Sequence, residues 1–193
     1  MKSNPKILAF AGSTRKGSFN KKLLQLAVEA AQNKGAEVTV VDLKDYPMPL
    51  FDGDLEKEKG LPENGQKLKK LMIEHDGFLI ASPEYNSSFS GVLKNTIDWI
   101  SRPEKGVKDM IAFDGKVACL MSASPGGLGG VRGLAQLRSV LGNIKVIVLP
   151  GQVTVPKADE AFDDNGKLKN EKTQASVENL GKSLVEFLQR LGY

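Results

Sequence analysis

Five short apolar runs, separated by segments of helical periodicity, constrain this chain of 193 residues more than any other feature. The runs are continuously apolar and do not alternate with polar residues, which is typical of strands covered on both faces. Between them, apolar residues recur at the spacing of one helix face. The pattern therefore predicts an α/β fold in which parallel strands alternate with covering helices. The five predicted strands lie at 7–11, 38–41, 78–81, 117–121 and 146–149.

The predicted helices lie around 23–31, 68–72, 92–100, 134–141 and 171–191. Helices on both sides of one sheet make three layers, and five strands in this sequence suit the order 2-1-3-4-5 as well as any other doubly wound order. Because no repeat, low-complexity tract or linker interrupts the pattern, we expect a single domain over residues 1–193. Two connections, 44–62 and 101–114, are longer than usual and are candidates for a lid or a subunit contact.

Charge and composition exclude several classes of function. The chain has 27 Lys and Arg against 23 Asp and Glu, and this excess of +4 is dispersed without a basic block, so we expect no nucleic-acid partner. The single cysteine, Cys119, and the single histidine, His75, leave too few ligands for a structural zinc site, and we expect no metal. We interpret Cys119 as a core residue of a strand. A Ser-His-Asp hydrolase is not predicted, because His75 is interpreted as the last residue of a helix.

The first apolar run, 7–12, is too short for a signal peptide and far too short to span a membrane. We therefore expect a cytoplasmic protein without a membrane partner. The sparing use of cysteine is typical of a reducing compartment.

Three loops that follow the first, third and fourth strands are where a ligand site is expected, because ligands bind at the carboxyl ends of such strands. The first loop, 12–20, enters a helix whose N-terminus favours anions. Its Ser13, Arg15, Ser18 and Asn20 form a donor-rich cup for a phosphate monoester. The alternative is an ordinary polar helix start with Ser18 as its cap, and the residues of this loop alone leave both open. An NTPase is not predicted, because Ser18 stands where a P-loop has its lysine.

The second loop, 82–91, is stiffened by proline and glycine and carries an aromatic ring, an amide and hydroxyls. Such a loop suits the polar edge of a flat heteroaromatic ring.

The third loop, 122–132, is rich in glycine, which lets a backbone approach a ligand closely. It is not a dinucleotide fingerprint, because it ends on Arg132 and follows the fourth strand. A Mg²⁺-binding receiver domain is not predicted either, because such a domain holds its metal with carboxylates at the ends of the first and third strands, and this chain has none there. Trp99, in the helix after the second loop, is interpreted as core packing.

Taken together, these loops resemble the NADPH-dependent FMN reductase family, the flavodoxin-like quinone, azo and chromate reductases. The matching segments are GSTRKGSFN at 12–20, SPEYNSSFSGVLKNTIDWISRP at 82–103 and SASPGGLGGVRGLAQLRSVL at 122–141. The middle segment is the most specific, and the similarity runs from the first predicted strand to the fifth. One departure is Ser90, where the family usually has proline before the glycine that enters the helix.

The resemblance implies a flavodoxin-like doubly wound sheet of order 2-1-3-4-5 and a noncovalently held FMN. It implies that the phosphate is held by Ser13, Arg15, Ser18 and Asn20. It implies that the isoalloxazine is lined, largely through backbone amides, by Pro83, Glu84, Tyr85 and Asn86. It implies that the other side of the flavin is closed by Ser122, Ser124, Gly126 and Gly127.

The resemblance also implies an oxidoreductase in which NADPH or NADH supplies two electrons and leaves before a quinone, azo compound, chromate or flavin accepts them, a ping-pong mechanism. Because the flavin carries the chemistry, no dedicated catalytic side chain is expected. The family commonly forms homodimers or homotetramers. A second class of function is a flavodoxin-type electron carrier serving protein partners, although such carriers tend to be acidic and this chain has a net charge of +4. A third is a binding module without a cofactor.

Overall fold

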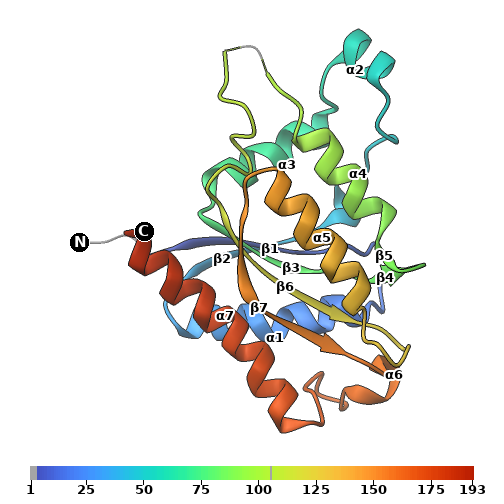
Figure 1. Ribbon diagram of the computed structural model, residues 1–193, viewed down its shortest axis with the longest axis vertical. Coiled ribbons are helices and arrows are strands. Elements are labelled where there is room, and N and C mark those ends of the chain that lie inside the picture. Colours follow the sequence, from blue (N-terminus) through green and yellow to red (C-terminus); the bar gives the residue numbers. More distant parts are fainter. Residues whose placement is uncertain (1–3, 105) are drawn as a thin grey trace.

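A central parallel sheet of five strands lies between two groups of helices (Figure 1). This computed structural model describes residues 4–104 and 106–193. The sheet contains β1 (Lys6–Ala11), β2 (Glu37–Asp42), β3 (Gly77–Ala81), β6 (Val117–Ala123) and β7 (Ile147–Val155). The strands are ordered β2-β1-β3-β6-β7, and every neighbouring pair is parallel. Counted along the chain, this is the predicted order 2-1-3-4-5 of a flavodoxin-like fold.

The five predicted helices are confirmed, and they divide between the two faces of the sheet. One face is covered by α1 (Phe19–Asn33) and α7 (Glu171–Leu191). The other face is covered by α3 (Glu63–Glu74), α4 (Gly91–Ile100) and α5 (Val131–Asn143). Five shorter elements were not predicted, because each is too short to display a period: η1 (Leu43–Asp45), α2 (Gly53–Lys59), α6 (Ala158–Ala161) and the strands β4 (Glu84–Tyr85) and β5 (Ser88–Phe89).

Each central strand contributes side chains to two separate cores, because successive residues of a strand point to opposite faces. In β1, Ile7 and Ala9 pack with α1 and α7, whereas Leu8 and Phe10 pack with α3, α4 and α5. Both faces are therefore apolar, which explains why these strands read as continuous apolar runs.

The two edge strands differ from that expectation, since they are only partly covered. In β2 most residues retain exposure, and Val40 is 51% exposed. In β7 the register with β6 shifts between Ala118 and Leu120, so the chain bulges around Pro150 and Gly151. The guanidinium of Arg138 donates to the carbonyl of Leu149 at 2.9 Å and thereby satisfies part of the backbone that the bulge leaves unpaired.

The interpretations of His75, Cys119 and Trp99 as structural residues are confirmed. His75 ends α3, and its ring nitrogens lie 2.6 Å from the Leu71 carbonyl and 2.8 Å from the Thr39 hydroxyl. Cys119 lies buried in β6, and its burial raises the pKa of the thiol to about 12. Trp99 is fully buried in α4.

Both long connections pack against the helices beside them. In 44–62, the indole N–H of Trp99 donates to the Pro49 carbonyl at 2.8 Å, and the Asn95 side chain accepts from the Phe51 N–H at 2.8 Å. In 101–114, the buried ammonium of Lys69 donates to the Arg102 carbonyl at 2.7 Å. A role for either connection as a lid or subunit contact stays a prediction. Within residues 4–104 and 106–193, no helix is long and apolar enough to cross a membrane.

Candidate functional site

The three loops singled out in the sequence meet in one cavity at the carboxyl ends of β1, β3 and β6. The cavity has a volume of about 260 Å³. Its walls come from the β1–α1 loop, the segment that follows β3 and the segment that follows β6. It is lined by Ser13, Arg15, Ser18, Phe19, Asn20, Pro83, Glu84, Tyr85, Ala123, Ser124 and Pro125.

The first loop serves both as a helix cap and as a wall of the cavity. Ser18 caps α1, because its hydroxyl accepts from the Lys21 N–H at 3.4 Å, and the same residue lines the cavity. The first-turn N–H groups of a helix have no partner within the helix, so they carry partial positive charge toward this cavity. The two interpretations of this loop, phosphate cup and polar cap, are therefore compatible.

The side-chain amide of Asn20 ties α1 to the end of β6. Its Nδ2 donates to the Ala123 carbonyl at 2.8 Å, and its Oδ1 accepts from the Ala123 N–H at 3.0 Å. The pair is buried and spans 103 positions of the chain. One N–H of the amide remains available to a ligand.

The second loop folds as a tight hairpin between β4 and β5. Asn86 and Ser87 form its turn in the left-handed region, with φ of 50° and 66°, as in the turns whose twist suits a hairpin. Tyr85 stands at the cavity and is 58% exposed. These residues were predicted to form a stiff loop, and the hairpin was not predicted because its strands have only two residues each.

Ser90 connects the first and second loops. Its hydroxyl donates to the Gly12 carbonyl at 2.6 Å, and it also accepts from the Leu93 N–H at 3.3 Å as the cap of α4. A proline at this position has no side-chain hydroxyl and makes neither bond. With Ser90 as its cap, α4 begins at Gly91, one residue before the predicted range of 92–100.

The glycines of the third loop divide into two groups. Gly129 and Gly130 have φ of 60° and 92°, and a Cβ at Gly130 would overlap the hydroxyl of Ser122. In contrast, no atom lies within 4 Å of a Cβ placed on Gly127, and Gly126 meets only the Ser124 hydroxyl at 3.5 Å. Open backbone for a ligand is therefore confined to Gly126 and Gly127, and the other two glycines serve internal packing.

Eight of the twelve predicted cofactor residues line the cavity, namely Ser13, Arg15, Ser18, Asn20, Pro83, Glu84, Tyr85 and Ser124. Asn86 lies one residue further, in the hairpin turn, while Gly126 and Gly127 follow Pro125 on the third loop. Ser122 is fully buried behind Gly130, and its hydroxyl has no hydrogen-bond partner within the described chain. The binding roles of all twelve stay predictions.

Three lining residues were missed: Phe19, Ala123 and Pro125. Phe19 stacks on Phe162 with ring centroids 6.3 Å apart, and the Arg15 guanidinium lies 5.2 Å from the Phe19 centroid. The available signal for Phe19 was its position between two predicted phosphate ligands. Phe162 lies 143 positions further along the chain, and no local pattern connects the two.

Charge in the cavity favours an anion. No ion pair neutralises Arg15 among the residues described by the structure. Glu84 also lines the cavity, but its Oε2 accepts from the Gly133 N–H at 2.8 Å. The uncompensated positive groups are therefore Arg15 and the first turn of α1, which together suit a phosphate.

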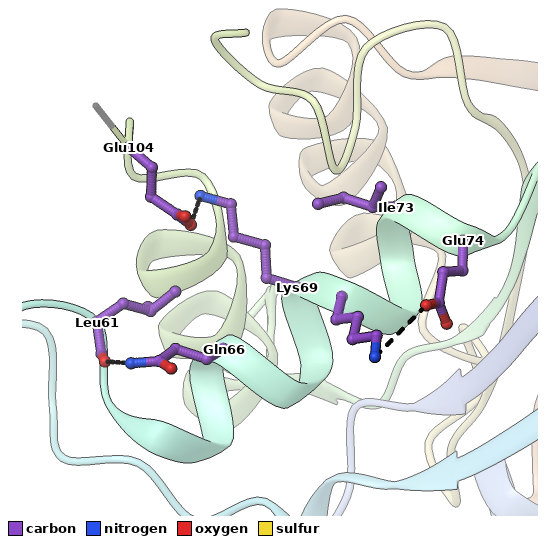
Figure 2. Close-up of a pocket in the computed structure, with 7 residues that line it drawn as sticks. Leu61, Gln66, Lys69, Ile73, Glu74 and Glu104 are labelled. Carbon is purple, nitrogen blue, oxygen red and sulfur yellow. Dashed lines mark hydrogen bonds and ion pairs between the residues drawn. The ribbon is translucent and has the colours of Figure 1, made fainter. Parts of the chain in front are cut away.

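Among the described residues, three larger cavities lie outside this edge of the sheet, and the smallest of them, of about 310 Å³, is lined mainly by residues of β7 and α7. One, of about 410 Å³, lies beside α3 (Figure 2), where Lys69 pairs with Glu104 at 2.5 Å and Gln66 donates to the Leu61 carbonyl at 2.9 Å. The polar groups drawn there already have partners within the protein. Another, of about 530 Å³, lies between α4 and α5 and is lined in part by Phe89 and Val140. No cluster of His, Cys, Asp and Glu suited to a metal occurs in 4–104 or 106–193.

The chain is similar to known flavin-dependent oxidoreductases in both sequence and structure. The family model described as NADPH-dependent FMN reductase matches residues 5–160. The chain is 33% identical to the NAD(P)H-dependent FMN reductase of Pseudomonas aeruginosa, over 99% of both chains. It is 30% identical to the quinone reductase of Escherichia coli strain K12, also over 99% of both. Among solved structures, a flavoenzyme NAD(P)H:(acceptor) oxidoreductase from Paracoccus denitrificans matches with a TM-score of 0.78 and 26% identity, covering 98% of this chain and 100% of that one.

Proposed function

Because the chain belongs to the NADPH-dependent FMN reductase family, we propose that its cavity at the ends of β1, β3 and β6 holds FMN and serves electron transfer from NAD(P)H to a quinone-like acceptor. The chain is an oxidoreductase with FMN as its cofactor and NAD(P)H as its electron donor. The observation that supports this location is the convergence of three loops on one cavity whose charge is set by Arg15 and the N-terminus of α1.

The cavity meets the two chemical demands of FMN, which are a phosphate at one end and a flat ring at the other. At the phosphate end, Ser13 and Ser18 offer hydroxyls, Arg15 offers a guanidinium, and the remaining amide N–H of Asn20 lies on the first turn of α1.

At the ring end, the hairpin and the third loop both line the cavity. The isoalloxazine is proposed to lie against Pro83, Glu84, Tyr85 and Asn86, with Ser124, Gly126 and Gly127 on the other side. The space around Gly126 and Gly127 supports this, since nothing in the protein fills it. Ser122 contributes, in this proposal, by supporting Gly130 from behind.

When bound, FMN supplies reversible two-electron transfer at its ring. The chain's own residues bind the phosphate, hold the polar edge of the ring and leave access to the cavity from solvent. Of the lining side chains only Arg15, Glu84 and Tyr85 ionise, and the Glu84 carboxylate is already bound to the backbone of α5. We therefore assign no catalytic side chain. We propose that donor and acceptor use the same open face in turn, so that the donor leaves before the acceptor binds and the mechanism is ping-pong.

The proposal also covers domain organisation, location in the cell and oligomeric state. Residues 1–193 act as one flavin-binding domain in the cytoplasm, without a nucleic-acid partner. The chain forms a homodimer or homotetramer, and exposed apolar residues beside the cavity, Leu128 at 52% and Val131 at 38%, are consistent with a covered face there. Sedimentation velocity of the purified protein tests the oligomeric state.

The first experiment is the visible spectrum of the purified protein, followed by anaerobic addition of NADPH and, separately, NADH. Flavin bands that bleach and return on addition of a quinone support the reductase and rank the two donors. Bound flavin that resists both nucleotides but accepts one electron from dithionite indicates an electron carrier. A protein that stays colourless after incubation with FMN contradicts both. Initial rates at several acceptor concentrations then test the ping-pong mechanism, which predicts parallel double-reciprocal lines.

A further inference from the structure

The N-terminus of α5 lacks a cap of its own. Its first residue, Val131, follows Gly130, which has no side chain and adopts a φ of 92°. The first N–H groups of a helix need partners from elsewhere, and a residue such as Ser or Asp usually provides one. Here the partner is Glu84, 49 positions earlier, whose Oε2 accepts from the Gly133 N–H at 2.8 Å.

The hydrogen bond between Glu84 and Gly133 lies where the β4–β5 hairpin packs closely against α5. The Glu84 side chain is only 13% exposed. A Cβ on Gly133 would lie 3.3 Å from the Cβ and Cγ of Glu84 and 3.2 Å from the Ser88 carbonyl, so glycine allows this close approach. Arg132 places its Nε 3.8 Å from Glu84 Oε1, and the positive end of α5 faces the same carboxylate. The buried charge is thus balanced.

Two further residues of α5 hold the turn of the same hairpin. Arg132 donates from Nη1 to the Ser87 hydroxyl at 3.1 Å, and Gln136 donates from Nε2 to the Ser87 carbonyl at 2.9 Å. Ser87 is one of the two left-handed residues of that turn. The first turns of α5 therefore fix both the β4 strand and the turn of the hairpin.

We propose that Glu84 is a positioning residue for the flavin: its carboxylate caps α5 and so fixes the β4–β5 hairpin relative to the glycine loop across the cavity. This inference rests on the proposed function, since it concerns the two walls between which the ring is placed. It assigns the Glu84 carboxylate to the protein and leaves only the backbone of this residue for the flavin.

The test measures the Kd of FMN for the apo-protein by quenching of flavin fluorescence. Glu84→Ala removes the cap, and the Kd is expected to rise about tenfold, because one buried hydrogen bond to a charged acceptor is lost from a wall of the site. Glu84→Gln keeps an acceptor oxygen for Gly133, and its Kd is expected to stay within about threefold of wild type.

A matched control separates positioning from general stability. Asn170 caps α7 through the Thr173 N–H at 3.0 Å, outside the cavity lining. Asn170→Ala is expected to lower the thermal midpoint without changing the FMN Kd or the absorption spectrum of bound FMN, whereas Glu84→Ala changes all three. If Glu84→Ala does not fold, Gln136→Ala loosens the same hairpin from an exposed position and is expected to raise the Kd in the same direction.

The proposal is overturned if Glu84→Ala or, failing its folding, Gln136→Ala binds FMN with the wild-type Kd and spectrum. Failure of the proposed function looks different, because then the wild-type protein itself does not bind FMN. In that case hydrogen exchange of the apo-protein still tests whether the Glu84 cap fixes the β4–β5 hairpin to α5. Amides of residues 84–89 are expected to exchange faster in Glu84→Ala than in Asn170→Ala, and equal exchange in the two variants contradicts the inference.

Discussion

The side-chain amide of Asn20 pairs with the backbone of Ala123 as a neighbouring strand would, accepting from its N–H at 3.0 Å and donating to its carbonyl at 2.8 Å. The contact extends the hydrogen bonding of β6 on the side of β3, past the last pair between these two strands at Ala81 and Met121. It joins the loop proposed to hold a phosphate to the loop proposed to face a ring. Both partners are buried.

Replacement of Asn20 by alanine leaves the N–H and the carbonyl of Ala123 without these partners. The free energy of unfolding is expected to fall by about 2–4 kcal/mol, because each unsatisfied buried group costs on the order of 1–3 kcal/mol. Urea denaturation measures the loss. Gln25→Ala, which removes an exposed bond to Glu29 in the same helix, is the control and is expected to change stability by less than about 0.5 kcal/mol.

Arg15 is expected to contribute to FMN binding through the phosphate alone. Arg15→Ala should raise the Kd of FMN by about tenfold or more, because a charge-assisted bond to the phosphate is lost. Riboflavin lacks the phosphate, and its Kd should not change. Lys16→Ala, an adjacent exposed cation, serves as the control. Equal weakening of FMN and riboflavin by Arg15→Ala would place the phosphate elsewhere.

The two groups of glycines in the third loop predict opposite outcomes for the same substitution. Gly130→Ala forces a Cβ onto the Ser122 hydroxyl at a φ of 92°, and should cost about 2 kcal/mol or more of unfolding free energy. Gly127→Ala meets no atom within 4 Å and should change stability by less than about 0.5 kcal/mol. Thermal denaturation of the two apo-proteins compares them directly. Similar stability of the two variants would contradict the packing role of Gly130.

Cys119 is expected to be unreactive in the native protein. Burial raises the pKa of its thiol from the ordinary 9.0 to about 12, and this outweighs the opposing positive charge of Arg138. At pH 8 a thiol of that pKa is about one part in ten thousand thiolate, so Ellman's reagent should label it only after unfolding in guanidinium.

The same shift predicts a pH dependence of stability. The thiol of Cys119 ionises near pH 9 in the unfolded chain and near pH 12 in the folded protein. The contribution of this neutral thiol to the free energy of unfolding is therefore complete below pH 9 and is lost as the pH rises from 9 to 12. Cys119→Ala should remove this part of the alkaline loss of stability. An unchanged alkaline profile in Cys119→Ala would contradict it.

The order of strands and helices could be predicted from the sequence because local composition sets it. A run such as 7–11 is apolar on both faces only if both faces are covered, and the helix stripes between such runs provide the cover. The three loops lie at one edge because each follows the carboxyl end of a strand, and parallel strands all have their carboxyl ends at the same edge of the sheet. The family resemblance added the cofactor and the kind of reaction.

The functions of individual side chains within the site depended on contacts between distant segments, which no local pattern contains. Glu84 appears in the sequence as one polar residue of a stiff loop, yet its carboxylate caps a helix that begins 47 positions later, at Val131. The glycines of 126–130 look equivalent in the sequence. Only the folded chain, which places Ser122 behind Gly130 and the backbone of Val155 behind Gly129, separates those that pack from those that stay open. The sequence by itself determined the fold and the edge at which ligands bind, because periodicity and chain direction are local properties. Only the tertiary structure decided which polar groups are used within the protein and which remain for a ligand, because a hydrogen bond is assigned by distance in space.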